Sequence, residues 1–354
     1  FFSVPCSMRP KHALWLFFLL LAAPLQPTCL TSTTHGLNGT INGQLSLAHH
    51  LKCEVSSTAI QLFASRVHCP TDGQPKSHST VFQLHGQSIH AIELPLGMRP
   101  WRLQLLNTTM MAFLSTSGDT QHDHRRGTGC FYNFVNMDGS VPLRVGLPYA
   151  THDAHYSTAS QTIFYIALQL RPFERDCLPF FRKGDKGYLE TIREVNLAGR
   201  TLWSLKVEHV LCHKPLVHTG DRRKHGTEPF HLNSVLYLHQ EGSLLLTSRF
   251  QGTVYKVSLN AISGQPALAW ALGWHGNMST YDVVRARDIA TPFFDLHFFT
   301  PLGHGRYAAF VNSEVPPPAT TYRVLSNRSL VRVIEVDEFR HRAYLVGEIS
   351  GPHR

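Results

Sequence analysis

The sequence predicts an all-β fold and, within that class, a β-propeller. Short runs of β-branched and aromatic residues alternate with Gly, Pro, Asn and Asp, as at 81–96, 130–145, 243–259 and 329–339. Runs of this kind, bounded by turn residues, are typical of strands joined by tight turns. Helical periodicity is scarce. A loose internal repeat, long enough for a four-stranded blade with long loops, favours the propeller.

The repeat begins at strands that each contain a histidine, namely His152, His231 and His297. Equivalent histidines at the start of successive blades are expected to face a central channel. The first two copies close on Trp203 and Trp270, which we expect to be core aromatics. Each copy ends in two strands joined by a turn, at 192–205, 254–272 and 332–349.

Residues 30–115 lack this repeat, and we expect them to form a small N-terminal β region or an atypical first blade. The propeller domain is predicted at 116–354. No stretch after the N-terminal region reaches transmembrane length.

The N-terminus predicts a secretory signal peptide at 8–29. Basic residues follow Met8, and the apolar run at 13–25 is too short to span a bilayer comfortably. An uncleaved signal anchor is the alternative and would be the protein's one membrane attachment. Residues 1–7 are interpreted as upstream sequence or as the end of a fragment.

Glycosylation sequons agree with export, and they predict a glycoprotein that is secreted or held in the secretory-pathway lumen. The sparse cysteines predict one or two structural disulfides, with Cys53 and Cys69 as the most plausible local pair. The sequons start at Asn38, Asn107, Asn277 and Asn327.

The charge of the chain favours anionic partners. It carries 33 Lys and Arg against 24 Asp and Glu, a formal net charge of +9. The basic clusters at 122–127 and 220–226 are short and lie among loop residues, whereas a nucleic-acid surface needs a continuous basic stripe. We therefore expect no nucleic-acid partner.

The residues that carry chemistry gather between 231 and 249. His231 and Asn233 are two residues apart, so their side chains share one face of a strand, and Arg249 returns one hairpin later. An imidazole, a carboxamide and a forked guanidinium together suit a tetrahedral oxyanion. His152 and His297, from the other copies of the repeat, are expected to complete this site.

The runs PFHLNSV (229–235) and LLLTSRFQGTVYKVS (244–258) resemble the arylsulfotransferases, also called aryl-sulfate sulfotransferases. The resemblance covers roughly 130–345 and is specific in 229–273. It implies an exported six-bladed propeller that moves a sulfuryl group from a phenolic sulfate ester to a phenol. It implies no cofactor, and in particular no 3′-phosphoadenosine phosphosulfate.

The resemblance assigns a role to each site residue. It makes His297 the sulfated nucleophile, and Arg249, Asn233 and His231 the clamp that holds the sulfate oxygens. His152 would transfer protons to and from the phenols. We also expect Tyr149 at the edge of an aryl pocket.

The surroundings of His297 depart from the family. The family has Gln-His-Asp there, whereas Leu296 and Phe298 flank His297 in this chain. The chain also ends at Arg354, before the remaining blades of the family would be complete. A C-terminally truncated propeller is therefore expected, and a ring that closes with fewer blades is the alternative.

A non-catalytic secreted propeller that binds a partner is the main alternative, because of these altered neighbours. A sulfatase has little support, since no Cys-x-Pro-x-Arg motif and no metal-carboxylate cluster is visible. A metal site built from the three histidines stays open as a further alternative, although we predict none. The sequence leaves the oligomeric state undetermined.

Overall fold

The structure is a computed structural model, and the residues that it describes fold almost entirely into β-strands; the α-helix among them, α1 (Glu208–Leu211), is a single turn. The strands form because their side chains alternate between two environments, as in β22 (Leu330–Asp337), where every second residue is buried. The all-β prediction is thereby confirmed. The residues described are 60–71, 74–85, 88–94, 98–117, 130–212, 221–223, 226–260, 265–274, 276–283, 285–289, 293, 295–311 and 330–350.

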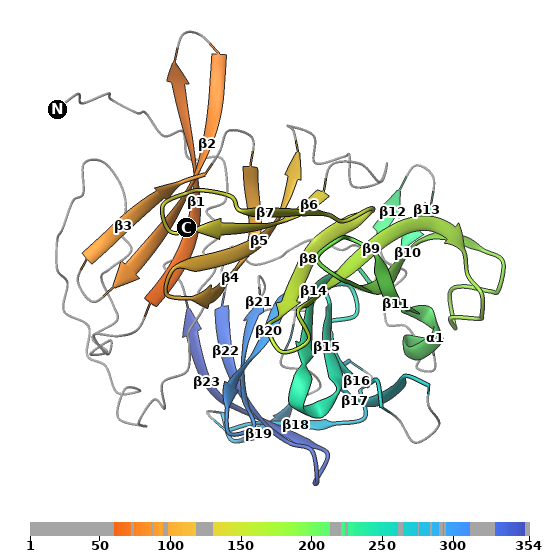
Figure 1. Ribbon diagram of the computed structural model, residues 1–354. Coiled ribbons are helices and arrows are strands. Elements are labelled where there is room, and N and C mark those ends of the chain that lie inside the picture. The colour runs from red at the N-terminus through yellow and green to blue at the C-terminus, as the bar shows by residue number, and fades with distance from the viewer. Residues whose placement is uncertain are drawn as a thin grey trace.

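Four consecutive antiparallel sheets, each built on an up-and-down run of four strands, are the blades of a β-propeller (Figure 1). The first strands of neighbouring blades, β4, β8, β14 and β20, contact one another in sequence order. The first blade is β4 (Met98–Asn107), β5 (Met110–Ser117), β6 (Cys130–Asn136) and β7 (Leu143–Gly146). The second is β8 (Ala150–Ser157), β9 (Thr162–Pro172), β10 (Lys186–Val195) and β11 (Thr201–Lys206). The third is β14 (Leu232–Leu238), β15 (Ser243–Ser248), β16 (Thr253–Ser258) and β17 (Ala267–Gly273). The fourth is β20 (Leu296–Gly303), β21 (Arg306–Val311), β22 and β23 (Arg342–Ser350).

Two short hairpins extend the outer parts of the blades. The pair β12 (Asp221–Arg223) and β13 (Gly226–Glu228) joins the second blade, because β13 runs parallel to β10. The pair β18 (Ser279–Asp282) and β19 (Arg287–Ile289) joins the fourth blade through a parallel pairing of β18 with β23.

The core lies between the blades, where the apolar faces of neighbouring sheets pack against each other. One buried cluster joins the first and second blades, a second joins the second and third, and another joins the third and fourth. Trp270 is buried in the cluster between the third and fourth blades, and the half-buried Trp203 packs against the one between the second and third. Both tryptophans are therefore core aromatics, as predicted.

The N-terminal β region contains a three-stranded sheet, followed directly by the first blade. That sheet is β1 (Ile60–Thr71), β2 (Gln74–His85) and β3 (Ser88–Glu93). The predicted boundary between residues 115 and 116 falls inside β5, which pairs with both β4 and β6. The first blade thus begins at Met98. The described residues contain four blades, and the six expected from the resemblance stay a prediction.

A disulfide links Cys177, after β9, to Cys212, at the end of α1. It ties the β9–β10 connection to the helix beside the second blade. Cys53, from the predicted Cys53–Cys69 pair, lies outside the described residues. So do the predicted signal peptide at 8–29 and residues 1–7. Among the described residues, no helix is long and apolar enough to cross a membrane.

Candidate active site

The inner strands of the second, third and fourth blades begin with unusual backbone. His152 in β8, His231 just before β14 and Asp295 just before β20 have φ angles of 56°, 48° and 52°. Non-glycine residues rarely adopt this left-handed conformation, and where they do, function is a fair hypothesis. All three residues lie at the start of the inner strands β8, β14 and β20, and β14 contacts both β8 and β20.

A β-bulge follows in the third and fourth blades and directs one side chain from each strand. In β14 the ladder skips Asn233 between Leu232 and Ser234, and in β20 it skips His297 between Leu296 and Phe298. Bulges free a residue from the ladder and re-aim its side chain. Asn233 and His297 therefore hold equivalent positions in adjacent blades.

This register corrects the expected equivalence of the three histidines. His297 was aligned with His231 because both are histidines near the start of a strand. The structure instead matches His297 with Asn233, and it puts Asp295 at the position of His231. The two-residue offset arises because residue identity carries no information about a bulge.

Asn233 connects the third blade to His297. Its Nδ2 donates a hydrogen bond to the backbone oxygen of Leu296 at 3.0 Å and lies 3.1 Å from Nδ1 of His297. Thr247 adds a hydrogen bond of 3.3 Å from its Oγ1 to the backbone oxygen of His297. Both the backbone and the ring of His297 are thus held in place.

Arg249 reaches the same place from the end of β15. Its backbone nitrogen donates to the oxygen of His231 at 3.1 Å, so the hairpin returns the backbone of Arg249 to His231. Its Nε donates to Oδ1 of Asp295, and Oδ2 of Asp295 lies 3.9 Å from Nε2 of His297. Arg249 and His297 therefore lie against different oxygens of the same carboxylate, that of Asp295.

The charges of this group follow from its burial. Burial alone would raise the pKa of Asp295, but its interaction with His297 and the charge of Arg249 bring that pKa below its ordinary value. Burial lowers the pKa of His297 and outweighs the opposing effect of Asp295, while the charge of Arg249 lowers it further. At neutral pH we therefore expect an ionised Asp295 and a neutral His297.

His231 and His152 form the other side of the site. The two rings meet edge to face with their centroids 4.4 Å apart, and the Phe250 ring lies 4.6 Å from that of His231. Nδ1 of His231 lies 3.1 Å from Oε1 of the buried Glu228. Nδ1 of His152 is 2.6 Å from the hydroxyl of Thr151.

Two carboxyl groups of the second blade bind the backbone of β14 directly. Glu190 accepts a hydrogen bond from the nitrogen of Leu232 at 3.0 Å, and Asp153 accepts one from the nitrogen of Val235 at 2.9 Å. Burial, with the negative charge of Glu228, raises the pKa of Glu190 to about 8. Asp153 thus joins two blades, which is a structural role.

Tyr149, the expected edge of an aryl pocket, has a φ of 63° and is half-buried. Its side chain packs against the cluster between the first and second blades, and its backbone oxygen accepts a hydrogen bond from Leu168 at 2.9 Å. The structure places it among core residues, so its role in substrate binding stays a prediction.

Asp295, Glu228 and Glu190 were not predicted as site residues from the sequence. Asp295 lies two residues before His297 and Glu228 three before His231, so an acid close to each histidine was the available signal. Glu190 offered none, because its partner Leu232 is 42 residues away. In the described part of the chain, no group of three or more His, Cys, Asp or Glu residues has an arrangement that could hold a metal ion.

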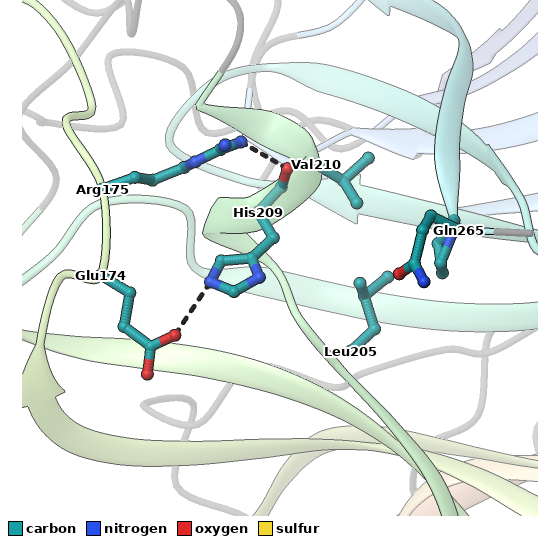
Figure 2. Close-up of a pocket in the computed structure, with 7 residues that line it drawn as sticks. Glu174, Arg175, Leu205, His209, Val210 and Gln265 are labelled. Carbon is teal, nitrogen blue, oxygen red and sulfur yellow. Dashed lines mark hydrogen bonds and ion pairs between the residues drawn. The ribbon is translucent and has the colours of Figure 1, made fainter. Parts of the chain in front are cut away.

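A cavity of about 430 Å³ lies elsewhere, beside α1 and the outer strands of the second and third blades (Figure 2). Figure 2 shows the ring of His209 facing Glu174, and Arg175 donating to the backbone oxygen of His209. Nε2 of His209 is 3.0 Å from Oε2 of Glu174, and the hydrogen bond from Arg175 is 2.7 Å long. Lys206 also pairs with Glu174. These exposed charges satisfy one another, so the inner-strand group is the better candidate site.

Comparisons with known proteins give no family. No protein-family profile and no curated protein matches the sequence. Among solved structures, a hypothetical selenium-binding protein from Sulfolobus tokodaii is 8% identical, with 82% of this chain and 64% of that chain covered and a TM-score of 0.44. The chain thus spans less than two thirds of that protein.

Two further structures are similar at the same level. The periplasmic gluconolactonase PpgL of Pseudomonas aeruginosa is 11% identical, with 83% of each chain covered and a TM-score of 0.39. An α-L-arabinanase of Penicillium chrysogenum is 12% identical, with 72% of this chain and 67% of that chain covered and a TM-score of 0.38. Similarity this distant carries no argument about activity.

Proposed function

We propose that the protein is a secreted aryl-sulfate sulfotransferase, which moves a sulfuryl group from a phenolic sulfate ester to a phenol. One observation carries the proposal. Asn233 and Arg249, from the third blade, converge on His297 of the fourth, Asn233 directly and Arg249 through Asp295. His231 and His152 add two imidazoles beside them, which meet edge to face. These residue types suit a tetrahedral anion next to a nitrogen nucleophile.

The proposed reaction has two steps. An unprotonated ring nitrogen of His297 attacks the sulfur of the donor, an N–S bond forms, and the S–O bond to the aryl group breaks. The phenolate leaves and takes a proton from His152. In the second step a phenol loses its proton to His152 and attacks the same sulfur, which breaks the N–S bond and restores His297.

The clamp acts on the oxygens that do not react. Arg249 and His231 would hold them, because charge shifts within the sulfuryl group as the bonds exchange. Asn233, expected in this clamp, would instead orient His297, because its amide N–H groups face the Leu296 oxygen and Nδ1 of His297. The guanidinium of Arg249 is a planar fork of N–H donors, a geometry that suits the oxygens of a tetrahedral anion. The depressed pKa of His297 supports its role as well, since only the neutral ring is a nucleophile.

Transfer from 4-nitrophenyl or 4-methylumbelliferyl sulfate to a phenol tests the proposal. The purified, folded protein should release the fluorescent or coloured phenol faster when an acceptor is present. His297→Ala should lower that rate by about a hundredfold or more, because the nucleophile is removed. His239→Ala, which changes an exposed histidine after β14, should leave the rate unchanged.

Mass spectrometry supplies the second measurement. After mixing with donor alone, a sulfuryl group should be found on His297 and not on His239. Folded protein that transfers nothing and carries no sulfuryl group would refute the proposal.

A non-catalytic binding propeller is the second candidate, and one observation favours it. Because Nδ2 of Asn233 donates to the Leu296 oxygen and lies 3.1 Å from Nδ1 of His297, the neutral ring carries its hydrogen on Nε2, toward Asp295. Attack through Nε2 requires the other tautomer. Binding of an aryl sulfate without turnover would support this candidate.

A further inference from the structure

Asp295 lies in the place where an anion would be expected to bind. Its side chain is only 5% exposed. One carboxylate oxygen accepts the Nε–H of Arg249, and the other lies 3.9 Å from Nε2 of His297. A sulfuryl group held by Arg249 and attacked by His297 would have to bring its oxygens to these same two groups.

The charge of Asp295 acts against such a ligand. Within the Arg249–Asp295–His297 cluster, the carboxylate interacts with the cation Arg249 and with the ring of His297, and His231 acts on the ring of His297. When Asp295 is ionised, its negative charge cancels the positive charge of Arg249. A sulfate ester that approaches Arg249 therefore meets an ion pair without net charge, and the carboxylate of that pair repels it. Like charges within a few ångströms in a buried site repel strongly.

We propose that Asp295 is an internal anion that competes with the sulfuryl group for Arg249 and thereby sets the affinity of the site for anions. The inference rests on the proposed function for the identity of the natural ligand, an aryl sulfate. The competition itself concerns any tetrahedral anion. Asp295 is thus a specificity-determining residue, and a donor must draw Arg249 away from it.

The backbone role of Asp295 can be separated from its charge. Its φ of 52° is a conformation that Asn tolerates well and Gly adopts freely. Asp295→Asn keeps an oxygen that can accept the Nε–H of Arg249, while it removes the negative charge. Asp295→Gly removes the whole side chain and keeps the backbone angle.

Binding of inorganic sulfate, measured by titration calorimetry, tests the proposal without any catalysis. Asp295→Asn and Asp295→Gly should each bind sulfate at least about tenfold more tightly than the natural protein, because one like charge is gone. Adding Arg249→Gln to Asp295→Asn should abolish that gain. Asp288→Asn, which changes an exposed carboxylate paired with Arg342, is the matched control and should change nothing.

Measurements on the Asp295 variants can overturn the proposal in three ways. Sulfate affinity within twofold of the natural protein in both Asp295 variants would overturn the proposal, and so would a gain that survives the loss of Arg249. Loss of the fold in both variants would also overturn it, since the carboxylate would then be a structural requirement. If no sulfuryl transfer is ever found but the variants bind sulfate more tightly, the proposed function fails and this inference stands.

Discussion

Asn233 and His297 occupy the same bulged position in adjacent blades, and Nδ2 of the first lies 3.1 Å from Nδ1 of the second. Each bulge turns one side chain out of its ladder, so two residues 64 positions apart meet. The amide of Asn233 also binds the backbone oxygen of Leu296. One carboxamide thus fixes both the start of β20 and the orientation of the proposed nucleophile.

Asn233→Ala should destabilise the fold and release the ring of His297. The substitution leaves the buried oxygen of Leu296 without its donor, which typically costs about 1–3 kcal/mol. Urea unfolding measures the change in the free energy of unfolding. Asn260→Ala, at an exposed position after β16, is the control and should stay within about 0.5 kcal/mol of the natural protein.

A second measurement separates orientation from stability. Nitrogen-15 NMR of His297 should show the hydrogen on Nε2 in the natural protein, because Nδ1 faces the donor Nδ2 of Asn233. In Asn233→Ala both tautomers should be populated. An unchanged tautomer together with unchanged stability would show that Asn233 does not hold the ring.

The fold could be predicted because strand periodicity is local. The alternation visible at 329–339 becomes β22, whose burial alternates along its whole length. The position of Arg249 beside His231 was equally accessible, since a hairpin returns its second strand to the start of the first. Both predictions needed only the period of a strand and the length of one turn.

The register between blades was not accessible in the same way. His297 aligns with Asn233, and not with His231, because of bulges that no residue type reveals. Glu190 reaches Leu232 across two blades, so its importance follows from packing alone. The sequence therefore singled out His231, Asn233, Arg249 and His297, whereas their equivalences and the presence of Asp295 between Arg249 and His297 required the structure.

Lys256→Met should loosen the contact between the third and fourth blades. Lys256 is 8% exposed, and its Nζ lies 2.5 Å from Glu241 of the third blade and 2.6 Å from Glu338, at the β22–β23 turn of the fourth. Methionine keeps the apolar stem and removes the charged hydrogen bonds, which are worth about 1–3 kcal/mol. Urea unfolding should show a lower free energy of unfolding for Lys256→Met, and high salt should make the difference from the natural protein smaller.

Lys206→Met is the matched control for this variant. Lys206 pairs with Glu174, but both side chains are more than two fifths exposed. Water screens such a pair, so its loss should cost less than about 1 kcal/mol. If the free energy of unfolding fell equally in Lys256→Met and Lys206→Met, the ion pairs of Lys256 between the blades would contribute no more to stability than an exposed pair.

Glu190→Gln should change how stability depends on pH. The pKa of Glu190 rises from 4.5 to about 8 in the folded protein, because the side chain is buried beside the charge of Glu228. Between those two values the folded chain binds more protons than the unfolded chain, so the free energy of unfolding falls as pH rises. The decline should amount to a few kcal/mol, on the order expected for a shift of this size.

Glutamine cannot ionise, and its Oε1 can still accept the hydrogen bond from Leu232. Urea unfolding from pH 5 to pH 9 should therefore show a much flatter profile in Glu190→Gln, with the variant more stable than the natural protein at the alkaline end. Glu174→Gln is the control: a hydrogen bond from Lys206 lowers the pKa of this exposed carboxyl, so the alkaline decline should persist. A decline as steep in Glu190→Gln as in the natural protein would mean that Glu190 is already ionised when folded.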